Sequence, residues 1–205
     1  MALVVCETFA SLMGESTRAG VPAFFIRLTG CNLRCTYCDT AYAYEGGSAM
    51  TVGALTDLAR AQPHRLALVT GGEPLLQAET PVLLTELLDA GFTVCLETNG
   101  SLPIGAVDGR VHRILDIKCP GSGMADHNDY TNLYQLTSRD EIKFVVADRL
   151  DFTWALKIIK HFGLAGQLPV LISPVFGQLA LPEAAAWILA TGLPLRLNLQ
   201  LHKYI

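Results

Sequence analysis

Three cysteines near the start of the chain have a spacing that suits a metal centre. Cys31, Cys35 and Cys38 form a C-x3-C-x2-C pattern within GCNLRCTYCD, residues 30–39. In a loop after a strand, such short spacings let thiolates converge, and thiolates hold iron–sulfur clusters, usually four for a cubane. Only three are local here, and a missing fourth ligand leaves one iron open, as in catalytic metal sites. The pattern therefore predicts a cluster that binds a substrate or cofactor at that iron.

Two other sites are compatible with the same three thiols. One is a structural zinc site, which is disfavoured because no second Cys/His pair has finger-like spacing. The other is an electron-transfer cluster completed by Cys6, Cys95 or Cys119. Cys95 lies in a strand-like run and is interpreted, like Cys6, as a small apolar side chain, whereas Cys119 in a Lys-Cys-Pro turn is left open. All three kinds of site require reduced thiols, so we do not interpret the six cysteines as three disulfides.

Further polar segments follow four of the predicted strands. They are TGGEP at residues 70–74, ETNG at 97–100, DIK at 116–118 and QLHK at 200–203. Chemistry in parallel α/β folds gathers at the carboxyl ends of the strands. In the first segment the paired glycines let the chain pass close to a ligand, and Glu73 offers an anion for an ammonium group. A Gly-Gly-Glu-Pro run also forms ordinary turns, but next to the thiol loop it indicates a binding site.

Short apolar strands alternate with helical patterns and must position these residues. The strands are predicted over Leu3–Phe9, Ala23–Leu28, Leu66–Val69, Phe92–Glu97, Ile114–Ile117, Glu141–Val146, Val170–Ile172 and Leu195–Gln200. Helices are predicted over Val52–Ala61 with Thr51 as cap, from Thr80 to Leu88, from a cap at Asp151 to about His161, and from Pro182 to Thr191. The alternation predicts an α/β fold with a parallel sheet.

The length of the chain limits how far this sheet can close. A complete eight-unit barrel takes about 250 residues, and this chain has 205. The connection over residues 101–113 is too short and glycine-rich for a regular helix. We therefore expect an incomplete, open TIM-type barrel that forms a single domain over residues 1–205.

Composition and charge exclude several classes of protein. The chain is 51% hydrophobic and 17% charged, which favours a compact enzyme-like fold over disorder. No apolar stretch approaches the roughly 18 residues of a membrane span, and Glu7 interrupts the N-terminal apolar run, so a cytoplasmic protein is expected. The net charge of −4 gives no indication of a nucleic-acid-binding surface.

The cysteine pattern resembles the signature of the radical SAM superfamily. Tyr37 supplies the aromatic residue of C-x3-C-x-aromatic-C, and the Gly71–Pro74 stretch is similar to the second motif of that superfamily. The resemblance implies an abbreviated radical SAM core that binds a [4Fe–4S] cluster through Cys31, Cys35 and Cys38. It also implies that S-adenosylmethionine (SAM) binds the fourth iron through its amino and carboxylate groups, with Glu73 and nearby backbone contacting the amine.

Both ends of the chain extend the resemblance to one family. FASLMGES at residues 9–16, GVP at 20–22, CDT at 38–40 and LQLHKYI at 199–205 together resemble the 7-carboxy-7-deazaguanine synthase family. Its members convert 6-carboxy-5,6,7,8-tetrahydropterin into 7-carboxy-7-deazaguanine with loss of ammonia, on the route to the 7-deazaguanine nucleosides (queuosine type) of tRNA. The resemblance implies SAM as a regenerated cofactor, Mg²⁺, a homodimer, and a flavodoxin- or ferredoxin-type electron donor.

The resemblance also assigns roles to individual residues. Thr40 supplies a hydroxyl to Mg²⁺, because a hard cation prefers oxygen, and Asp39 is an alternative partner that acts on the ion without binding it directly. Residues that face SAM are Tyr37, Thr70, Gly71, Gly72, Glu73, Glu97, Asp116 and Lys118, and residues that bind the pterin are Leu12, Met13, Gly14, Glu15, Arg27 and His202.

The three charged or titratable pterin residues have alternatives. Arg27 suits a substrate carboxylate but could instead pair with Glu7 or Glu15. Glu15 suits the N–H edge of a pterin but could be a solvated loop charge. His202 either closes the pocket or caps an edge strand.

Two features of the sequence depart from the family pattern. Met13 stands where family members often carry Gln, so a side-chain role at Met13 is not expected, and relatives usually run a few residues beyond Ile205.

A glycyl-radical-enzyme activase shares the cysteine pattern but needs an open mouth for a protein substrate. A non-enzymatic iron–sulfur or zinc protein is the other alternative. Arg27, Glu15 and His202 favour a closed pocket for a small molecule.

Overall fold

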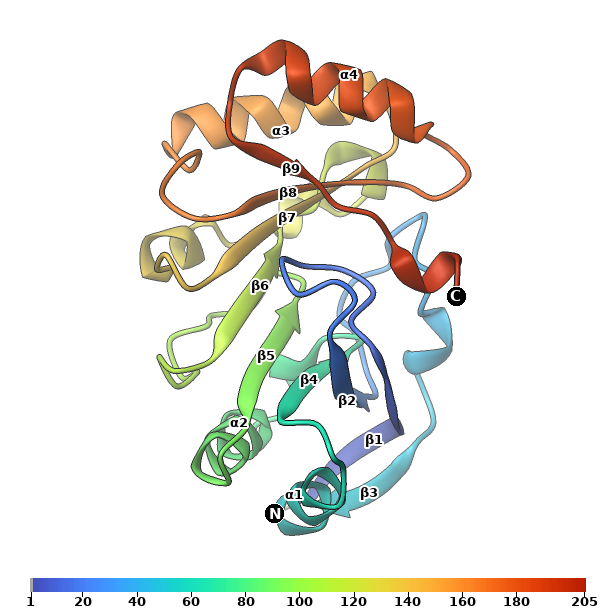
Figure 1. Ribbon diagram of the computed structural model, residues 1–205, viewed down its shortest axis with the longest axis vertical. Coiled ribbons are helices and arrows are strands. Elements are labelled where there is room, and N and C mark those ends of the chain that lie inside the picture. Colours follow the sequence, from blue (N-terminus) through green and yellow to red (C-terminus); the bar gives the residue numbers. More distant parts are fainter. Residues whose placement is uncertain (1) are drawn as a thin grey trace.

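The computed structural model describes residues 2–205, which contain a nine-stranded sheet flanked by helices (Figure 1). The strand order is β3-β1-β2-β4-β5-β6-β7-β8-β9, and every neighbouring pair from β2 to β9 is parallel. The two edge strands, β3 and β9, do not pair with each other in the described chain, so the sheet stays open. The predicted α/β fold with an incomplete barrel is confirmed. The strands are β1 (Ala2–Leu12), β2 (Pro22–Leu28), β3 (Ser48–Thr51), β4 (Leu66–Gly71), β5 (Thr93–Thr98), β6 (His112–Asp116), β7 (Glu141–Val146), β8 (Val170–Pro174) and β9 (Leu195–Leu197).

Two of these strands differ from the sequence-based expectation of an all-parallel sheet. β1 runs antiparallel to both β2 and β3, and β3 was not predicted. A short connection between β1 and β2 leaves no room for the crossover of a dozen or more residues that a parallel pair needs. β9 also ends at Leu197 rather than Gln200, because the chain then leaves the sheet and the Leu201 N–H donates to the Gly14 carbonyl at 2.8 Å.

The four α-helices lie where the sequence predicts them. Figure 1 shows α1 and α2 near the first strands of the sheet and α3 and α4 beside β7, β8 and β9. Thr51 caps the first helix as predicted, accepting from the Ala54 N–H at 3.2 Å, and no α-helix forms between β5 and β6. The helices are α1 (Val52–Arg60), α2 (Thr80–Asp89), α3 (Arg149–His161) and α4 (Leu181–Thr191).

The predicted cap of α3 was wrong. Asp148, not Asp151, is the capping residue, and its side chain accepts from the Asp151 N–H at 2.9 Å. The Asp151 carboxylate lies inside the first turn, where it accepts from the N–H groups of Gly121 at 2.7 Å and Ala147 at 3.0 Å. Asp151 therefore ties the loop after β6 to the start of α3.

Apolar side chains pack on both faces of the sheet. The larger cluster fills the space between the sheet and the helices. A smaller cluster lies on the opposite face, because residues alternate between faces along each strand; Phe25 belongs to it whereas Phe24 and Ile26 belong to the larger one. Cys95 is buried in the smaller cluster, as its interpretation as an apolar side chain requires. The members of the smaller cluster are Met13, Ala23, Phe25, Leu66, Leu68, Cys95 and Ile114.

The connection between β1 and β2, residues 13–21, is called the hairpin tip below. It reaches across to strands at the other end of the sheet (Figure 1). The Thr17 N–H donates to the Glu141 carboxylate at 3.1 Å, and the Ser16 N–H donates to Asn198 Oδ1 at 3.0 Å. The hairpin tip thus links the antiparallel part of the sheet to β7 and to the residue that follows β9.

In residues 2–205 no helix combines the length and the apolar character needed to cross a bilayer.

Candidate active site

A cavity of about 510 Å³ lies where β4, β5 and β6 end, between the cysteine loop and the hairpin tip. The structure brings all predicted site residues to this cavity except Glu73, while their individual roles stay predictions. Those that line it are Leu12, Met13, Gly14, Glu15, Arg27, Cys31, Cys35, Tyr37, Cys38, Thr40, Thr70, Gly71, Gly72, Glu97, Asp116, Lys118 and His202.

The cysteine loop presents three free, partly exposed thiols to the cavity. Cys31 Sγ accepts hydrogen bonds from the Leu33 N–H at 3.4 Å and from Asn99 Nδ2 at 3.8 Å. Burial raises the pKa of Cys35 above its usual value, so a bound metal, which deprotonates a coordinating thiol outright, would be needed to hold it as a thiolate. Donors aimed at one sulfur suit a thiolate ligand, and the donor set fits the predicted cluster.

Within residues 2–205, no group of three or more His, Cys, Asp or Glu side chains has the geometry of a site for a single metal ion.

The glycine pair of the TGGEP turn packs against the end of β2 and the start of the cysteine loop. A Cβ on Gly71 would lie 2.1 Å from the carbonyl oxygen of Leu28, the last residue of β2, and one on Gly72 would lie 2.1 Å from the Gly30 carbonyl oxygen. The Glu73 N–H donates to that Gly30 carbonyl at 2.7 Å. The close approach of neighbouring backbone therefore requires glycine at both positions, and at Gly72 that backbone belongs to the cysteine loop.

Glu73 is placed differently from the expectation. Its side chain is 0% exposed and does not line the cavity. The carboxylate accepts from the N–H groups of Leu75 at 2.9 Å and Asn99 at 2.6 Å, and from the Thr98 hydroxyl. Burial raises the pKa of Glu73, although these donors act against that rise. The carboxylate ties the TGGEP turn to the ETNG segment, and the contact with an ammonium group stays a prediction.

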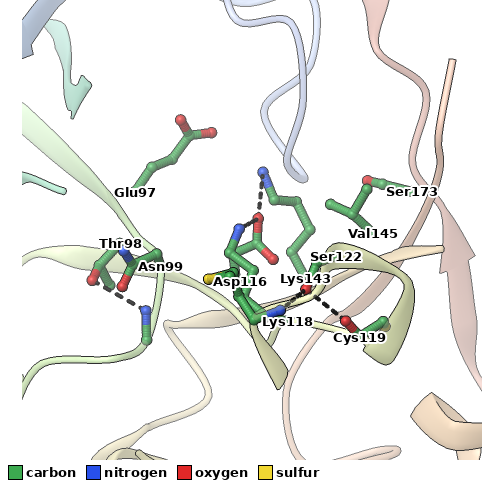
Figure 2. A network of polar contacts seen from close by, with 12 residues as sticks. Glu97, Thr98, Asn99, Asp116, Lys118, Cys119, Ser122, Lys143, Val145 and Ser173 are labelled. Atoms are coloured by element: carbon green, nitrogen blue, oxygen red, sulfur yellow. Dashed lines mark hydrogen bonds and ion pairs between the residues drawn. The ribbon is translucent and has the colours of Figure 1, made fainter. Parts of the chain in front are cut away.

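Hydrogen bonds and an ion pair hold several of the residues predicted to face SAM. Thr70 Oγ1 donates to Glu97 Oε2 at 2.7 Å, and the Tyr37 hydroxyl donates to the Val145 carbonyl at 3.2 Å. Lys118 Nζ lies 3.0 Å from Asp116 Oδ2, as Figure 2 shows. Burial opposes the charge on Lys118, but Asp116 and Cys35 together outweigh burial, so the pKa of Lys118 is raised. The ends of three adjacent strands thus hold fixed polar groups around one space.

Arg27 forms one of the ion pairs considered from the sequence, while its role toward a substrate carboxylate stays a prediction. Its Nε lies 2.7 Å from Glu7 Oε1, so the ion pair with Glu7 exists. The guanidinium also lines the cavity, between the rings of Phe9 and Tyr42 at 5.8 and 5.7 Å from their centroids. Because the ion pair uses Nε, the two terminal nitrogens are available to an anion.

Glu15 is a fixed charge and not a solvated one, so that alternative was wrong. Its side chain is 13% exposed. Lys143 Nζ lies 3.1 Å from Glu15 Oε2, Asn198 Nδ2 donates to the same oxygen at 3.2 Å, and Gln200 Nε2 donates to Oε1 at 3.2 Å. Met13, in contrast, is buried in the smaller apolar cluster, which agrees with the absence of a polar role for its side chain.

Residues after β9 bridge the hairpin tip and the cysteine loop. A Cβ on Gly14 would meet His202 Nδ1, so the two residues are in close contact. His202 Nε2 and Lys203 Nζ lie 3.5 and 2.7 Å from Asp39 Oδ2, and Thr40 Oγ1 donates to Asp39 Oδ1 at 3.0 Å. Hydrogen bonds from His202 and Lys203 hold the pKa of Asp39 well below its usual range. His202 thus lies over the cavity and does not cap an edge strand.

Several residues of the site were missed from the sequence. Lys143 carried a usable signal, because it is a lone lysine inside the otherwise apolar run IKFVV of a predicted strand. Asn99 lies in the ETNG segment that the sequence singled out, but its contact with Cys31 was not predicted, and Asn198 gave no signal, since the partners of both lie far away in the chain. Their contacts with Cys31 and with Glu15 depend on how the strands are ordered in the sheet.

Comparisons with known proteins agree with this geometry. Residues 25–172 match the Radical SAM superfamily. A 7-carboxy-7-deazaguanine synthase of Chlorobaculum tepidum is 46% identical over 99% of this chain and 94% of its own length. A protein of the same name from Koribacter versatilis is 38% identical over 98% and 96%.

A solved structure shares the fold. A crystal structure of QueE from Escherichia coli superposes with a TM-score of 0.79 at 23% identity, covering 98% of this chain and 94% of that one. From the motifs, the cavity and these relatives together, the chain belongs to the 7-carboxy-7-deazaguanine synthase family of the radical SAM superfamily.

Proposed function

We propose that the cavity is the active site of a radical SAM lyase that converts 6-carboxy-5,6,7,8-tetrahydropterin into 7-carboxy-7-deazaguanine with loss of ammonia. One observation carries the proposal: a single cavity is lined by the three thiols and also by the charged side chains of Arg27 and Glu15. The first set suits the cluster, and the second suits a small molecule with a carboxylate and an N–H edge. The named relatives favour this function over the glycyl-radical activase alternative.

A [4Fe–4S] cluster and SAM are the cofactors of this superfamily. Cys31, Cys35 and Cys38 are the residues that would hold the cluster, and Tyr37, Thr70, Gly71, Gly72, Glu97, Asp116 and Lys118 line the space proposed for SAM. When bound, the cluster and SAM would supply the radical chemistry of the reaction.

The task of the protein is to bind and orient the substrate and to exclude water. The terminal nitrogens of Arg27 would bind the substrate carboxylate, since a planar guanidinium matches a carboxylate in geometry and charge. The Glu15 carboxylate, held by Lys143 and Gln200, would accept from the N–H edge of the pterin ring. His202 lies against Gly14 and would separate this pair of contacts from solvent.

Magnesium is part of the proposal through Thr40. Its hydroxyl lines the cavity, and Mg²⁺ prefers oxygen ligands while keeping several waters. One protein oxygen together with substrate oxygens would therefore suffice. Asp39 is already neutralised by Lys203 at 2.7 Å, so its carboxylate is better suited to orienting the Thr40 hydroxyl than to binding the ion.

Assembly, electron supply and location rest on the family resemblance. We propose a homodimer, for which the exposed apolar side chains of Leu150 and Leu189 on α3 and α4 offer surface. A flavodoxin- or ferredoxin-type protein would supply electrons, since Asn32, Arg34 and Thr36 place the cysteine loop at the surface. A cytoplasmic location is supported by the six free thiols. Residues 1–205 would act as one catalytic domain.

The activity is tested with protein reconstituted anaerobically with iron and sulfide. With carboxytetrahydropterin, SAM, Mg²⁺ and a reductant, we expect 7-carboxy-7-deazaguanine by mass spectrometry, and none when SAM is omitted. A SAM-dependent change in the EPR signal of the cluster without any product would refute the substrate assignment. Absence of both the change and the product would refute the radical mechanism.

The role of Thr40 has its own test. Thr40→Ala should lose most of the rate increase that Mg²⁺ gives the parent protein, roughly tenfold for a single lost contact to a charged group, with SAM binding unchanged. Thr40→Ser keeps the hydroxyl and serves as the control. A Thr40→Ala variant with the parental response to Mg²⁺ would remove Thr40 from the metal site.

A further inference from the structure

Lys143 is a charged residue on the inner face of an otherwise apolar strand. In β7, Ile142, Phe144 and Val146 face the main core, whereas Lys143 and Val145 face the cavity. The lysine side chain is 11% exposed. A buried ammonium is costly unless carboxylates surround it, so its partners should explain its presence.

Two carboxylates from different parts of the chain meet at Lys143. Its Nζ lies 3.1 Å from Glu15 Oε2 on the hairpin tip and 3.6 Å from Asp116 Oδ2 at the end of β6. Figure 2 shows Lys143 and Lys118 converging on Asp116, with the hairpin tip close to the Lys143 amine. These four residues, Glu15, Asp116, Lys118 and Lys143, are called the Lys143 cluster below.

The charges of the cluster are balanced by the second lysine. Burial opposes the charge on Lys143, but Glu15, Asp116 and Glu97 outweigh it and hold its pKa well above the usual value. Lys143 is therefore a cation throughout the range in which the enzyme would work. Without it, two carboxylates would face each other across the space that its ammonium occupies.

The two carboxylates do not depend on Lys143 equally. Asp116 keeps Lys118 at 3.0 Å, which is closer than Lys143 at 3.6 Å. Glu15 has no other cation within ion-pair distance in residues 2–205, and its remaining partners are the neutral amides of Asn198 and Gln200. Loss of Lys143 should thus disturb the hairpin side of the cavity much more than the SAM side.

We propose that Lys143 is a positioning residue, which fixes the Glu15 carboxylate for recognition of the pterin edge while Lys118 independently holds Asp116 on the SAM side. This inference rests on the proposed function. Lys143 lies in a strand and belongs to no sequence motif. It would align Glu15, a loop residue 128 positions away.

The test compares Lys143→Met with Lys143→Arg, alone and in a Glu15→Gln background. Lys143→Met removes the charge at similar length and should raise KM for the pterin roughly ten- to a hundredfold, with kcat within about threefold of the parent and the SAM-dependent EPR change retained. Lys143→Arg should restore most of KM. In the Glu15→Gln background, Lys143→Met should add less than about threefold, because residues that act through one contact are not additive.

A second measurement does not depend on turnover. In Lys143→Met, hydrogen exchange should become faster at residues 13–17, roughly threefold or more by the same loss of one charged contact, and stay unchanged at residues 30–40. If exchange at residues 13–17 is faster in Lys143→Met than in the parent, but the parent forms no product, the proposed function fails and the positioning role stands.

Other outcomes would overturn the positioning role. Unchanged exchange and unchanged KM in Lys143→Met mean that Glu15 is held without Lys143. Additive effects in the Glu15→Gln background mean that Lys143 acts directly on the substrate. Loss of SAM affinity equal to the rise in KM means that the lysine serves both sides of the cavity.

Discussion

The cysteine loop and the Lys143 cluster line the same cavity, but they are built from very different stretches of chain. The loop takes its three thiols from eight consecutive positions, residues 31–38, and Gly72 of the adjacent TGGEP turn packs against it. The cluster joins the hairpin tip to the end of β6 and to the middle of β7, where Lys143 reaches Glu15 across 128 positions. A motif of the first kind is visible as spacing, whereas the second kind exists only once the sheet has formed.

The cysteine loop and the Lys143 cluster should also respond differently to substitution. Ligands of a metal centre cannot be replaced by neighbours, so the cysteine loop should respond to substitution in an all-or-none way. In a network of hydrogen bonds and ion pairs several partners hold each side chain. Substitution of one member should therefore reduce activity only in part. Four substitutions test this contrast, in order of decreasing effect.

Removing one cysteine should have the largest effect. Cys35→Ala is expected to lose the [4Fe–4S] absorbance and all detectable product, because two thiolates are too few to hold the cluster with an open iron. Iron content and EPR spectra of reconstituted protein provide the measurement. Cys95→Ala is the matched control, since that thiol is buried in the smaller apolar cluster. A Cys35→Ala variant with a normal cluster would show that another residue is the ligand.

A structural ion pair away from the cavity should affect folding alone. Asp140 is fully buried and accepts from Arg113 Nε at 2.9 Å and Arg113 NH2 at 2.6 Å. Asp140→Asn should lower the free energy of unfolding by about 3–5 kcal/mol, measured by denaturant titration at neutral pH, with KM for the pterin unchanged. A change in KM would show that the Arg113–Asp140 ion pair also affects the charged residues that line the cavity.

The stability lost in Asp140→Asn should depend on pH, because the pKa of Asp140 is shifted in the folded protein. Burial works to raise the pKa of Asp140, but the Arg113 and Thr137 donors outweigh it and lower the pKa. The ion pair therefore stabilises the fold fully above the unfolded-state pKa of about 4, and this contribution fades as the pH falls through the folded-state value. The difference between parent and Asp140→Asn should accordingly be constant near neutral pH and shrink below about pH 4. A difference that grows in acid would contradict the assignment.

A glycine that touches the cysteine loop should give an intermediate effect. Gly72→Ala places a Cβ 2.1 Å from the Gly30 carbonyl oxygen and 2.8 Å from Cys31 Cβ, so the loop must move. We expect cluster content or SAM affinity to fall roughly tenfold, about 1.4 kcal/mol, measured by iron analysis and SAM titration. Gly53→Ala, with nothing within 4 Å, is the control and should leave both values unchanged. Parental SAM affinity in Gly72→Ala would show that the contact is not required.

The smallest effect is expected at the half-exposed rim of the cavity. Lys203→Ala removes the ion pair with Asp39, whose side chains are 26% and 42% exposed. Such pairs contribute about 0–1 kcal/mol, so KM for the pterin should rise by no more than about fivefold, and less at high salt. Steady-state kinetics at two salt concentrations provide the measurement. An effect as large as that of Lys143→Met would place Lys203 among the substrate-binding residues.

Much of the fold was predictable because buried strands carry a local signal. The run EIKFVV was predicted with the bounds of β7 itself. The strand β3 was missed because its four residues, SAMT, have no periodic pattern and are mostly exposed at an edge. The cap of α3 was misplaced because Asp148 and Asp151 are both suitable acceptors, and only the extended backbone at Asp148 selects between them.

The site shows the same division between local and distant information. The positions of the three thiols and the glycine pair follow from spacing, and the structure places them together. The orientation of Glu73 could not be predicted, because its hydroxyl and amide donors come from Thr98 and Asn99 on the next strand. Lys143 was visible as an anomaly in its strand, but its partners depend on the antiparallel pairing that brings the hairpin tip across the sheet.

The hairpin tip has a consequence for how new selectivity can arise in this scaffold. It carries the carboxylate proposed to select the substrate, yet it contributes no cysteine and no part of the TGGEP turn. A turn between two antiparallel strands tolerates changes of length and composition far better than a strand in the middle of a sheet. Evolution or an engineer can therefore exchange residues 13–21 as a cassette, redirecting the same radical chemistry to molecules of a different outline.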